Sequence, residues 1–423
     1  MTAPRITARK PSARRRRTED PRRADRILAP LRHRDFRLLL LGQSVSRLGD
    51  RIYAVALPFQ MFALGASPLE LGLAAAILDL SYLVFVLVGG AVADRMSRRQ
   101  LILASDLAAG LGVGAVAVLS WTGQLAVAHM YAVSAVFGAA EAFLAPAYTA
   151  LVPELVPNDI LQSSSALRSL SRSVARIAGP AIGGVIVVAG GPGLGFGVDA
   201  LTFAVSFATL LFVRTPRREP PPVASLLSEV RQGFGFTLGL PWVVAGALGF
   251  ALLNVAYSGQ TSVLMPLLVR DVLRGDAATF GAITAAFGAG AILAALMLTR
   301  IRIAHAGIGL YVFELAAALA LVAMGLITNV PGVLVLMLVI GVAATGSDVV
   351  WQTTLQRHVR GEMLGRVSSI ASLGTYLLNP LAPLVAGLLV QGFGPATSLT
   401  VVGVYAVIVA TLLLFASPLR RLR

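Results

Sequence analysis

Cysteine is absent from this 423-residue chain, and histidine is scarce. Without cysteine the chain has no disulfide bridge, no thiolate metal ligand and no cysteine nucleophile. The four histidines lie far apart and show no metal-ligand spacing: His33, His129, His305 and His358. The sequence also contains no catalytic constellation and no phosphate-binding loop of the GxxxxGKS or GxxxxGKT type. We therefore expect no enzyme activity, no metal, no cofactor and no ATP coupling within the chain.

Charged residues are also few. They make up 13% of the chain, whereas 57% of the residues are hydrophobic and the mean hydropathy is +0.80. A soluble domain is about one quarter charged, and a membrane-spanning helix needs about 20 apolar residues. The sequence contains twelve apolar stretches of suitable length: residues 36–64, 69–92, 100–120, 125–147, 163–188, 194–213, 242–268, 278–299, 305–327, 331–353, 364–390 and 395–416. This pattern predicts an all-α membrane protein with twelve transmembrane helices.

The charges that are present are unevenly placed. Residues 1–37 hold thirteen basic and four acidic residues, which account for +9 of the net charge of +15. Residues 1–35 are polar and have no apolar period, so we predict a disordered, arginine-rich tail. Its Arg14–Arg17 run could bind anionic lipid or nucleic acid, but we interpret it as a topology signal and expect no nucleic-acid partner.

Arginine also recurs in every second connection between the apolar stretches, and the other connections carry almost none. Loops rich in arginine and lysine stay on the cytoplasmic side of a membrane. The alternation therefore places both termini in the cytoplasm and predicts a multi-pass protein of the cell inner, or plasma, membrane.

The longest internal connection divides the stretches into two sets of six. It contains the run Glu219-Pro220-Pro221-Pro222 and an amphipathic piece, Leu226–Leu238, which we predict to lie at the membrane surface. The predicted organisation is a six-helix bundle at residues 36–213, a cytoplasmic linker at 214–241, a second bundle at 242–416 and a cytoplasmic tail at 417–423.

The two sets resemble each other. A shift of 203 residues places Pro180 on Pro383 and Gly184 on Gly387. Parallel repeats of six helices are typical of transporters, whose substrate path lies between the halves. We therefore expect two pseudo-symmetric halves.

A short motif joins the second and third stretches: Gly90-Ala91-Val92-Ala93-Asp94-Arg95-Met96-Ser97-Arg98-Arg99. It resembles the GxxxDRxGRR loop of the major facilitator superfamily of transporters, with Ser97 in place of the second glycine. The resemblance implies that superfamily's fold and a cytoplasmic gate formed by Gly90, Asp94, Arg95, Arg98 and Arg99. In such a gate, the aspartate accepts hydrogen bonds from a helix N-terminus and the arginines pair across the two halves. The alternative is a plain positive-inside loop.

The fifth stretch contains Gly179-Pro180-Ala181-Ile182-Gly183-Gly184. It resembles the GPxxGG core of a motif found in the antiporter, or exporter, branch of the superfamily, although Ser171 stands at the position of the usual upstream glycine. Proline removes a backbone hydrogen bond and glycine permits close helix approach. We predict that Gly179, Pro180, Gly183 and Gly184 give a bend and a tight contact in a moving helix. Ordinary small-residue packing is the alternative.

Seven acidic residues lie inside the predicted spans: Asp50, Asp79, Asp106, Glu141, Asp199, Glu314 and Asp348. A charge in the membrane is costly, so each is a candidate for function. Asp50 has Arg51 beside it and Arg47 on its helical face. Its segment, Ser-Arg-Leu-Gly-Asp, resembles that of bacterial macrolide-efflux and enterobactin-exporter-like members. The superfamily resemblance also implies that Glu141 and Asp348 lie on cavity-lining helices.

Three arginines of the fifth stretch, Arg168, Arg172 and Arg176, recur every four residues and share one helical face. We predict that Arg176 pairs with Glu141. We further predict that Asp50 or Glu141 takes up an outside proton, releases its arginine and returns the proton to the cytoplasm.

A static ion pair is the alternative for each of these carboxylates. Among the remaining acids, we predict structural roles for Asp199 and Glu314 and leave Asp79 and Asp106 open.

Together these features predict a monomeric secondary active exporter in the lipid bilayer. It would exchange protons for a bulky amphipathic small molecule, drug-like or macrolide-like, by alternating access. The transport candidates are Asp50, Arg51, Glu141, Arg172, Arg176 and Asp348. A close alternative is a dedicated siderophore or metabolite exporter. A different alternative is a membrane sensor or scaffold, which would depend on residues 1–30 and tolerate Asp50→Asn.

Overall fold

The computed structural model describes residues 28–95, 97–215, 234–300 and 305–421, with the backbone only at 87–95, 362 and 420–421. Residues 1–27 of the predicted disordered tail and most of the amphipathic piece of the linker lie outside the described residues. The prediction is wrong for the end of the tail, because residues 29–32 form a 3-10 turn and a long helix begins at Arg34. The described part consists of helices joined by turns and contains no strand. The predicted all-α fold class is confirmed.

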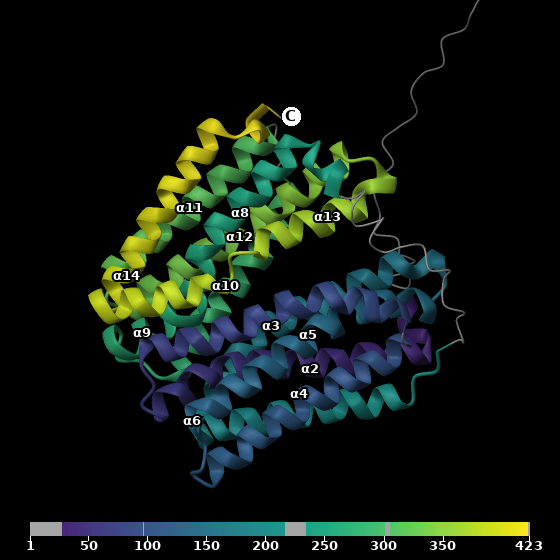
Figure 1. Ribbon diagram of the computed structural model, residues 1–423, viewed down its shortest axis with the longest axis horizontal. Coiled ribbons are helices and arrows are strands. Elements are labelled where there is room, and N and C mark those ends of the chain that lie inside the picture. Colours follow the sequence, from purple (N-terminus) through teal and green to yellow (C-terminus); the bar gives the residue numbers. More distant parts are fainter. Residues whose placement is uncertain (1–27, 96, 216–233, 301–304, 422–423) are drawn as a thin grey trace, which may run out of the picture.

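The first bundle, coloured purple to teal in Figure 1, contains five long helices. They are α2 (Arg34–Ala63), α3 (Pro68–Arg95), α4 (Arg98–Trp121), α5 (Val127–Leu155) and α6 (Leu161–Leu211), with short 3-10 turns at Ala29–Arg32 (η1) and Asn158–Ile160 (η2). Helix α2 packs mainly against α6, and α3 packs against α5. Helix α4 lies against both α5 and α6.

The second bundle, coloured green to yellow, follows the linker. It contains α8 (Pro241–Gly259), η3 (Gln260–Leu264), α9 (Met265–Leu267), η4 (Leu268–Val272), α10 (Ala277–Leu298), α11 (Ala306–Leu326), α12 (Val330–His358), α13 (Gly361–Tyr376), α14 (Leu381–Ala416) and η5 (Pro418–Arg421). The segments η3 and η4 are π-helical and flank Pro266. Proline removes one helical hydrogen bond, and π-helical turns mark such irregularities, which the apolar pattern did not predict.

Glycine bends the two longest helices. Gly191 in α6 and Gly394 in α14 have φ values of 75° and 74°, in the left-handed region that glycine adopts without strain. Each kink falls at a boundary predicted between apolar stretches, 163–188 and 194–213 in the first bundle, and 364–390 and 395–416 in the second. These boundaries are confirmed.

Nine helical segments among the described residues are long and apolar enough to cross a membrane. Two of them, Asn158–Leu211 and Met363–Ala416, have 54 residues each and contain the glycine kinks, so each is long enough for two crossings of about 20 residues. Helix α2 is not among the nine and carries Arg47, Asp50 and Arg51 near its middle. The chain is a multi-pass membrane protein, and the count of twelve crossings stays a prediction.

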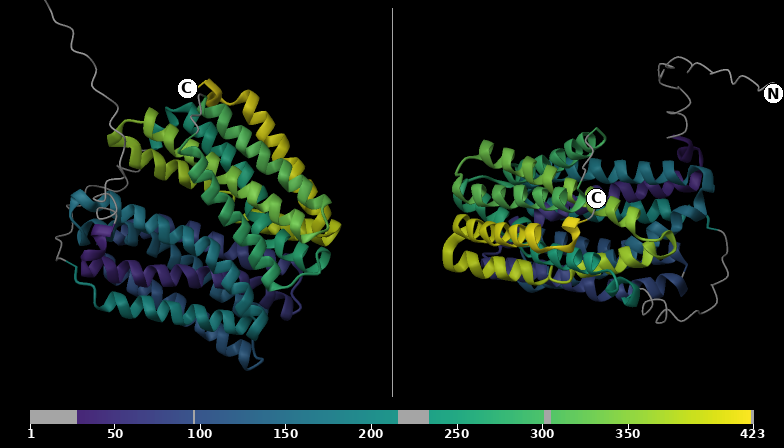
Figure 2. Two further views of the ribbon diagram at one scale, coloured as in Figure 1. Left: turned by 180° about the vertical axis from the view of Figure 1, so that it is seen from behind. Right: turned by 90° about the horizontal axis from the view of Figure 1, so that it is seen from above.

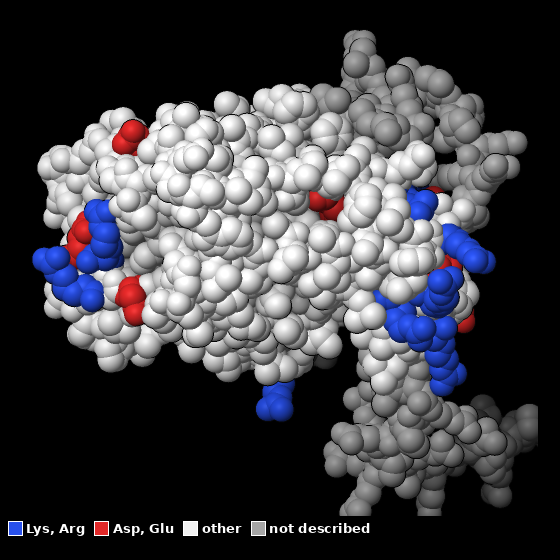
Figure 3. Space-filling model, turned by 90° about the horizontal axis from the view of Figure 1, so that it is seen from below, with Lys and Arg blue, Asp and Glu red and all other residues white. Residues whose placement is uncertain are grey.

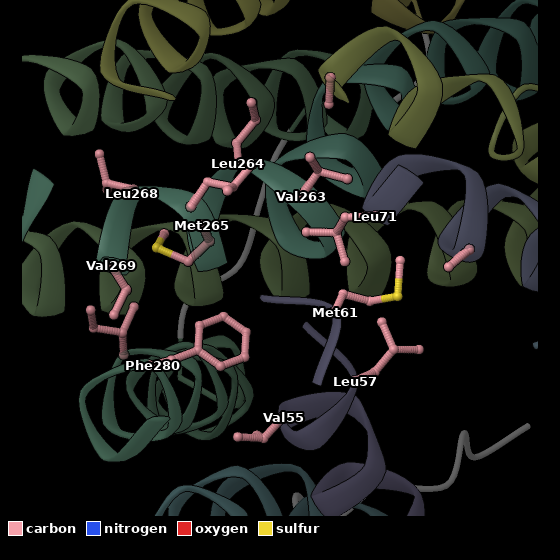
Figure 4. Close-up of a cluster of buried hydrophobic side chains, with 14 of the residues drawn as sticks. Val55, Leu57, Met61, Leu71, Val263, Leu264, Met265, Leu268, Val269 and Phe280 are labelled. Atoms are coloured by element: carbon pink, nitrogen blue, oxygen red, sulfur yellow. The ribbon is translucent and has the colours of Figure 1, made fainter. Parts of the chain in front are cut away.

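The two bundles meet at one end of the molecule and diverge towards the other, where α2 and α13 begin (Figures 1 and 2). A buried apolar cluster occupies the end where they meet (Figure 4). It joins first-bundle and second-bundle side chains: Val55, Leu57, Met61, Leu71, Val263, Leu264, Met265, Leu268, Val269 and Phe280. The face shown in Figure 3 carries most of its charged side chains near its two ends, with a largely uncharged belt between them. Such a belt suits the apolar interior of a bilayer.

Candidate functional site

The bundles touch mainly through two helix pairs, α6 with α10 and α3 with α14. In the first pair, a Cβ atom at Gly281 would overlap the carbonyl oxygen of Pro180. A Cβ at Gly184 would lie 2.5 Å from the carbonyl oxygen of Ala277, nearer than real Cβ atoms approach. Glycine therefore allows the two backbones to come into direct contact.

The second pair makes the same kind of contact. A Cβ atom at Gly72 would overlap the carbonyl oxygen of Pro383, and one at Gly387 would lie 2.7 Å from that of Pro68. We call these two glycine-lined regions the closed-end contacts.

The closed-end contacts are equivalent by internal symmetry. Pro383 and Gly387 follow Pro180 and Gly184 by 203 residues, so the predicted repeat is confirmed at these positions. In both contacts a proline carbonyl faces a glycine of the other bundle, and a glycine one turn later faces the start of a helix.

A cavity of about 430 Å³ lies between the bundles, within the range of about 300–1,000 Å³ typical of small-molecule sites. Its first-bundle lining is Arg47, Asp50, Arg51, Tyr53, Ala54, Val55, Leu57, Pro58, Ala75, Leu78, Asp79, Phe137, Glu141, Arg172, Ala175 and Pro180. Its second-bundle lining is Ser258, Thr261, Ser262, Pro266, Phe280 and Thr284. All charged lining residues thus come from the first bundle, and the second contributes hydroxyl and apolar groups.

Four of these charged residues interact electrostatically. Among the charges near Asp50, those of Glu141 on α5 and Arg51 on α2 have the strongest effect, followed by that of Arg47. Both arginines also act on Glu141. We call these residues the charge group. Two acids and two arginines therefore lie together in one part of the cavity wall.

Helix α6 carries three arginines near the cavity, of which Arg172 lines it. Arg168, Arg172 and Arg176 recur every four residues within this one helix, which places them on one face. The Arg168 guanidinium carbon lies 4.3 Å from the ring centroid of Tyr148, and that of Arg47 lies 5.4 Å from it. The buried tyrosine thus offers its ring to two cations, a favourable arrangement away from water.

The predicted partner of Arg176 is wrong. The groups that act most strongly on Arg176 are Arg51, Asp348 and Tyr376, whereas the arginines that act on Glu141 are those of α2. Arg176 and Asp348 belong to different bundles and do not line the cavity. The spacing of residues along a helix could not reveal that Arg176 lies near Asp348, because this proximity depends on how the two bundles are placed relative to each other.

The glycine-proline motif of α6 has two faces. Cβ atoms at Gly179 and Gly183 would press on Arg51 and Ile52 of α2, whereas Pro180 and Gly184 contact α10. The motif therefore holds α6 tightly against both α2 of its own bundle and α10 of the other. The predicted tight contact is confirmed, and its part in a moving helix stays a prediction.

The predicted gate loop is described only in part. The side chains of Gly90, Asp94 and Arg95 lie outside the described residues. Nη1 of Arg98 donates to Oε1 of Glu154 and to the carbonyl oxygen of Ala150, both at 2.6 Å. Arg98 therefore binds α5 of its own bundle.

Arg99 binds the end of α6. Its Nε donates to the carbonyl oxygen of Leu210 at 2.9 Å and its Nη2 to that of Leu211 at 2.7 Å, a favourable place for a cation. The predicted pairing of Arg98 and Arg99 across the halves is therefore wrong for this conformation. The bundles diverge at this end, and the arginines bind to the helices that remain near.

The structure locates the two acids, Asp79 and Asp106, to which the sequence assigned no role. Asp79 of α3 lines the cavity, as does Ser258 of the other bundle, whose hydroxyl acts on the Asp79 carboxyl group. Asp106 of α4 is buried, and Ser206 donates to its Oδ2 at 2.7 Å. The surroundings of both acids are formed by helices that are distant in the sequence. The sequence alone therefore showed only that these acids lie within predicted spans.

The remaining acids are buried. Glu314 of α11 lies in the second bundle, where the Tyr257 hydroxyl donates to its backbone oxygen at 3.2 Å. Asp199 of α6 is fully buried in the first bundle. Within the described ranges no three His, Cys, Asp or Glu side chains are grouped so that they could hold a metal ion.

The fold matches solved transporter structures. A bacterial homolog of the human lysosomal transporter Spinster, in an inward-facing and occupied conformation, aligns with a TM-score of 0.74 and 15% identity, covering 92% of this chain and 97% of that one. A D-xylose–proton symporter aligns with a TM-score of 0.69 and 15% identity, covering 93% and 99%. The chain therefore has the fold of the major facilitator transporters.

Sequence comparison narrows this class. The profile of the family MFS_3, described as "Transmembrane secretion effector", matches residues 26–343, and the chain belongs to this family. The enterobactin exporter EntS of Escherichia coli O1:K1 / APEC is 29% identical over 409 residues, which cover 92% of this chain and 94% of that protein. EntS of Shigella boydii serotype 18 is also 29% identical over the same coverage.

Proposed function

We propose that the chain is a proton-coupled antiporter that exports a bulky amphipathic compound by alternating access. The observation that carries this proposal is the charge group, Asp50 and Glu141 with Arg47 and Arg51, in the wall of a cavity between two bundles. A carboxyl group that gains a proton loses its attraction to arginine, so proton binding can alter the cavity wall.

The cavity suits a substrate with both aromatic and polar groups. Tyr53 and Phe137 stack with ring centroids 4.6 Å apart, and Phe280 adds a third aromatic wall residue. Charged residues and hydroxyl groups lie beside these rings. Binding sites of this kind hold a mainly apolar molecule and orient it by a few polar contacts.

The conformational state of the structure follows from the orientation that we propose. Arginine-rich connections place both termini in the cytoplasm, and the bundles diverge at the end where α2 begins. The structure then corresponds to a state that is open to the cytoplasm and closed towards the outside. We also propose that the units that move are the bundles at residues 36–213 and 242–416, that residues 214–241 link them, and that the transporter works as a monomer.

Inverted membrane vesicles test this function. An acidic lumen should drive uptake of one or more members of a dye and macrolide panel, and a protonophore should abolish it. In Asp50→Asn and Glu141→Gln, gradient-driven uptake should fall by more than about tenfold, which corresponds to about 1.4 kcal/mol. Glu314→Gln serves as the control, because this buried acid lies away from the cavity. Unchanged gradient dependence in both charge-group variants would contradict the carboxylate assignment.

A dedicated siderophore exporter is the second candidate, and the relatives favour it, because the similar proteins are enterobactin exporters. Deletion of the gene in its native host distinguishes the two candidates. Intracellular accumulation of one native siderophore, with unchanged sensitivity to the dye and macrolide panel, supports a dedicated exporter. Increased sensitivity to several unrelated compounds supports a multidrug pump.

A further inference from the structure

A fully buried acid lies behind the charge group. Asp199 belongs to α6 beyond the Gly191 kink and has no exposed surface. Thr202 donates to its Oδ1 at 3.2 Å, and its Oδ2 is buried without a hydrogen-bond partner. A half-satisfied carboxyl group in a membrane interior is costly and therefore points to function.

Asp199 lies against the cavity helix. A Cβ atom at Gly49 of α2 would overlap Oδ1 of Asp199 and Oγ1 of Thr202, so only glycine lets the carboxyl group approach α2 at this level. The next residue along α2 is Asp50, which lines the cavity. Gly49 and Asp50 are consecutive residues, about 100° apart around the axis of α2. The Asp50 charge acts electrostatically on Asp199.

The charges around the two acids differ. Asp50 has Arg51 and Arg47 on its cavity side. On Asp199 the largest effect is burial, followed by the charge of Asp50 and the Thr202 hydroxyl, and no arginine of the described chain is among the groups that act on it. Two neighbouring carboxyl groups with too few cations cannot both be ionised at low cost, so they share protons as a pair.

Other titratable groups near this place belong to α2, α4 and α5. Tyr53 of α2 lines the cavity, and its buried hydroxyl lies beside Ser134 of α5 and within reach of Asp199. Asp106 of α4 binds Ser206, which lies seven residues beyond Asp199, about 10 Å along α6. The charge that acts on Asp106 is that of Glu141, and the charge that acts on Asp199 is that of Asp50. Asp106 also acts on Asp50, more weakly than Glu141 does.

We propose that Asp199 is a second proton-binding group, which lies behind the cavity wall and exchanges a proton with Asp50. This inference rests on the proposed antiport. When Asp50 gives its proton to water in the cavity, it becomes a carboxylate. The O–H bond of Asp199 then breaks, an O–H bond forms on Asp50, and the negative charge passes to Asp199. A proton from the outer side restores Asp199, so the pair delivers protons while keeping one of its members neutral.

Infrared titration of the full-length protein in lipid membranes tests the pair. Carbonyl bands of protonated carboxyl groups are recorded from acidic to alkaline pH in wild type, Asp50→Asn and Asp199→Asn. Each variant identifies the band that it lacks. We expect the Asp50 band of Asp199→Asn to disappear at a pH lower by about one unit, the size of interaction that couples a carboxyl pair, because a neighbouring negative charge has been removed.

Glu314→Gln is the matched control, since it removes a buried acid of the other bundle and should leave the Asp50 titration unchanged. Thr202→Val provides a second test if Asp199→Asn does not fold. It removes the hydroxyl donor of Asp199, so the Asp199 band should persist to higher pH while the Asp50 band remains. The proposal is overturned if the Asp50 band titrates identically in Asp199→Asn, or if the Asp199 band stays constant over the range in which Asp50 titrates.

The spectra use neither a substrate nor a proton gradient. An unaltered Asp50 titration therefore rejects the pair and leaves the antiport standing. Conversely, wild-type vesicles without gradient-driven uptake reject the antiport, whatever the spectra show.

Discussion

The two bundles have equivalent contacts and unequal chemistry. At the closed end, Gly184 and Gly387 occupy the same place in two symmetry-related contacts, as do Pro180 and Pro383. In the cavity, the first bundle supplies every charged wall residue and the second supplies serine, threonine, proline and phenylalanine. The difference indicates that the repeat preserves the packing contacts between the two halves, whereas the charged wall residues are concentrated in one of them.

The largest expected effect comes from the charged wall. Arg51→Gln leaves Asp50 and Glu141 with one arginine fewer, and breaking a buried charge pair costs about 3–5 kcal/mol. We expect gradient-driven vesicle uptake to fall about a hundredfold, or about 2.8 kcal/mol, just below that range, because Arg51 is exposed in an open cavity. In the second bundle, Thr284→Val removes only a hydroxyl, so uptake should change less than about fivefold, which corresponds to about 1 kcal/mol. Equal losses in both variants would abolish the contrast between the bundles.

The next effect concerns the closed-end contacts. Gly184→Val and Gly387→Val place a side chain against the facing backbone, and overpacking costs about 1–3 kcal/mol. Because the contacts are equivalent, both variants should lower uptake to a similar extent, by about tenfold. Gly392→Val is the control, since a Cβ there meets open space.

Thiol labelling shows whether the closed end has opened. The chain has no cysteine, so Thr284→Cys introduces a unique label into the cavity wall. In combination with either valine variant, this cysteine should react faster with an impermeant maleimide added from outside. A change with only one of the two valine variants would show that one contact alone closes the cavity.

A smaller effect is expected for the charges that face each other across the bundles. Arg176 and Asp348 act on each other, so the changes that Arg176→Gln and Asp348→Asn make to uptake should not add. We expect a coupling of about 0.5–1 kcal/mol in a double-mutant cycle, the lower part of the range for interacting residues. The cycle of Arg172→Gln with Asp348→Asn provides the comparison and should be additive, because Asp348 is not among the main charges acting on Arg172. Equal coupling in both cycles would contradict a specific pair.

The smallest expected effect concerns the two helix N-caps at the closed end, one a serine and the other an aspartate. Ser67 accepts a hydrogen bond at the start of α3, and Asp276 caps α10 by accepting one from the Thr279 N–H at 2.9 Å. That hydrogen bond holds the pKa of Asp276 below its ordinary value of 3.8. Its stabilisation is therefore present above about pH 4 and is lost as the pH falls through the pKa of the folded state.

Thermal unfolding of the solubilised protein should detect this difference. Asp276→Ala should lower stability at neutral pH by less than about 1 kcal/mol, since the carboxylate is exposed. The difference from wild type should disappear at strongly acidic pH. Asp276→Ser should keep most of the stability, because serine is also a good cap, and should weaken its pH dependence. A constant difference at every pH would contradict a carboxylate cap.

The fold was more accessible to sequence reasoning than the site was. Apolar length, glycine boundaries and the Pro180–Pro383 repeat depend on neighbouring residues or on composition, and they predicted the helices and the symmetric contacts. The wall residues Asp50, Arg51, Glu141 and Arg172 were found because charges are rare in such a chain. The partner of Arg176 and the approach of Asp199 to Gly49 depend on the rotation and placement of distant helices. No periodicity in a single sequence contains that information.

The charged middle of α2 has a consequence for how the protein is made. A lone arginine or aspartate near the centre of a membrane helix disfavours insertion by about 2.5–3.5 kcal/mol. Helix α2 carries three such charges, yet α6, the helix against which it packs most extensively, begins only at Leu161. During synthesis α2 therefore waits for about a hundred residues before its main partner exists. We therefore expect stable membrane integration of the first helix to be a late event, completed only when the fifth predicted span has emerged from the ribosome.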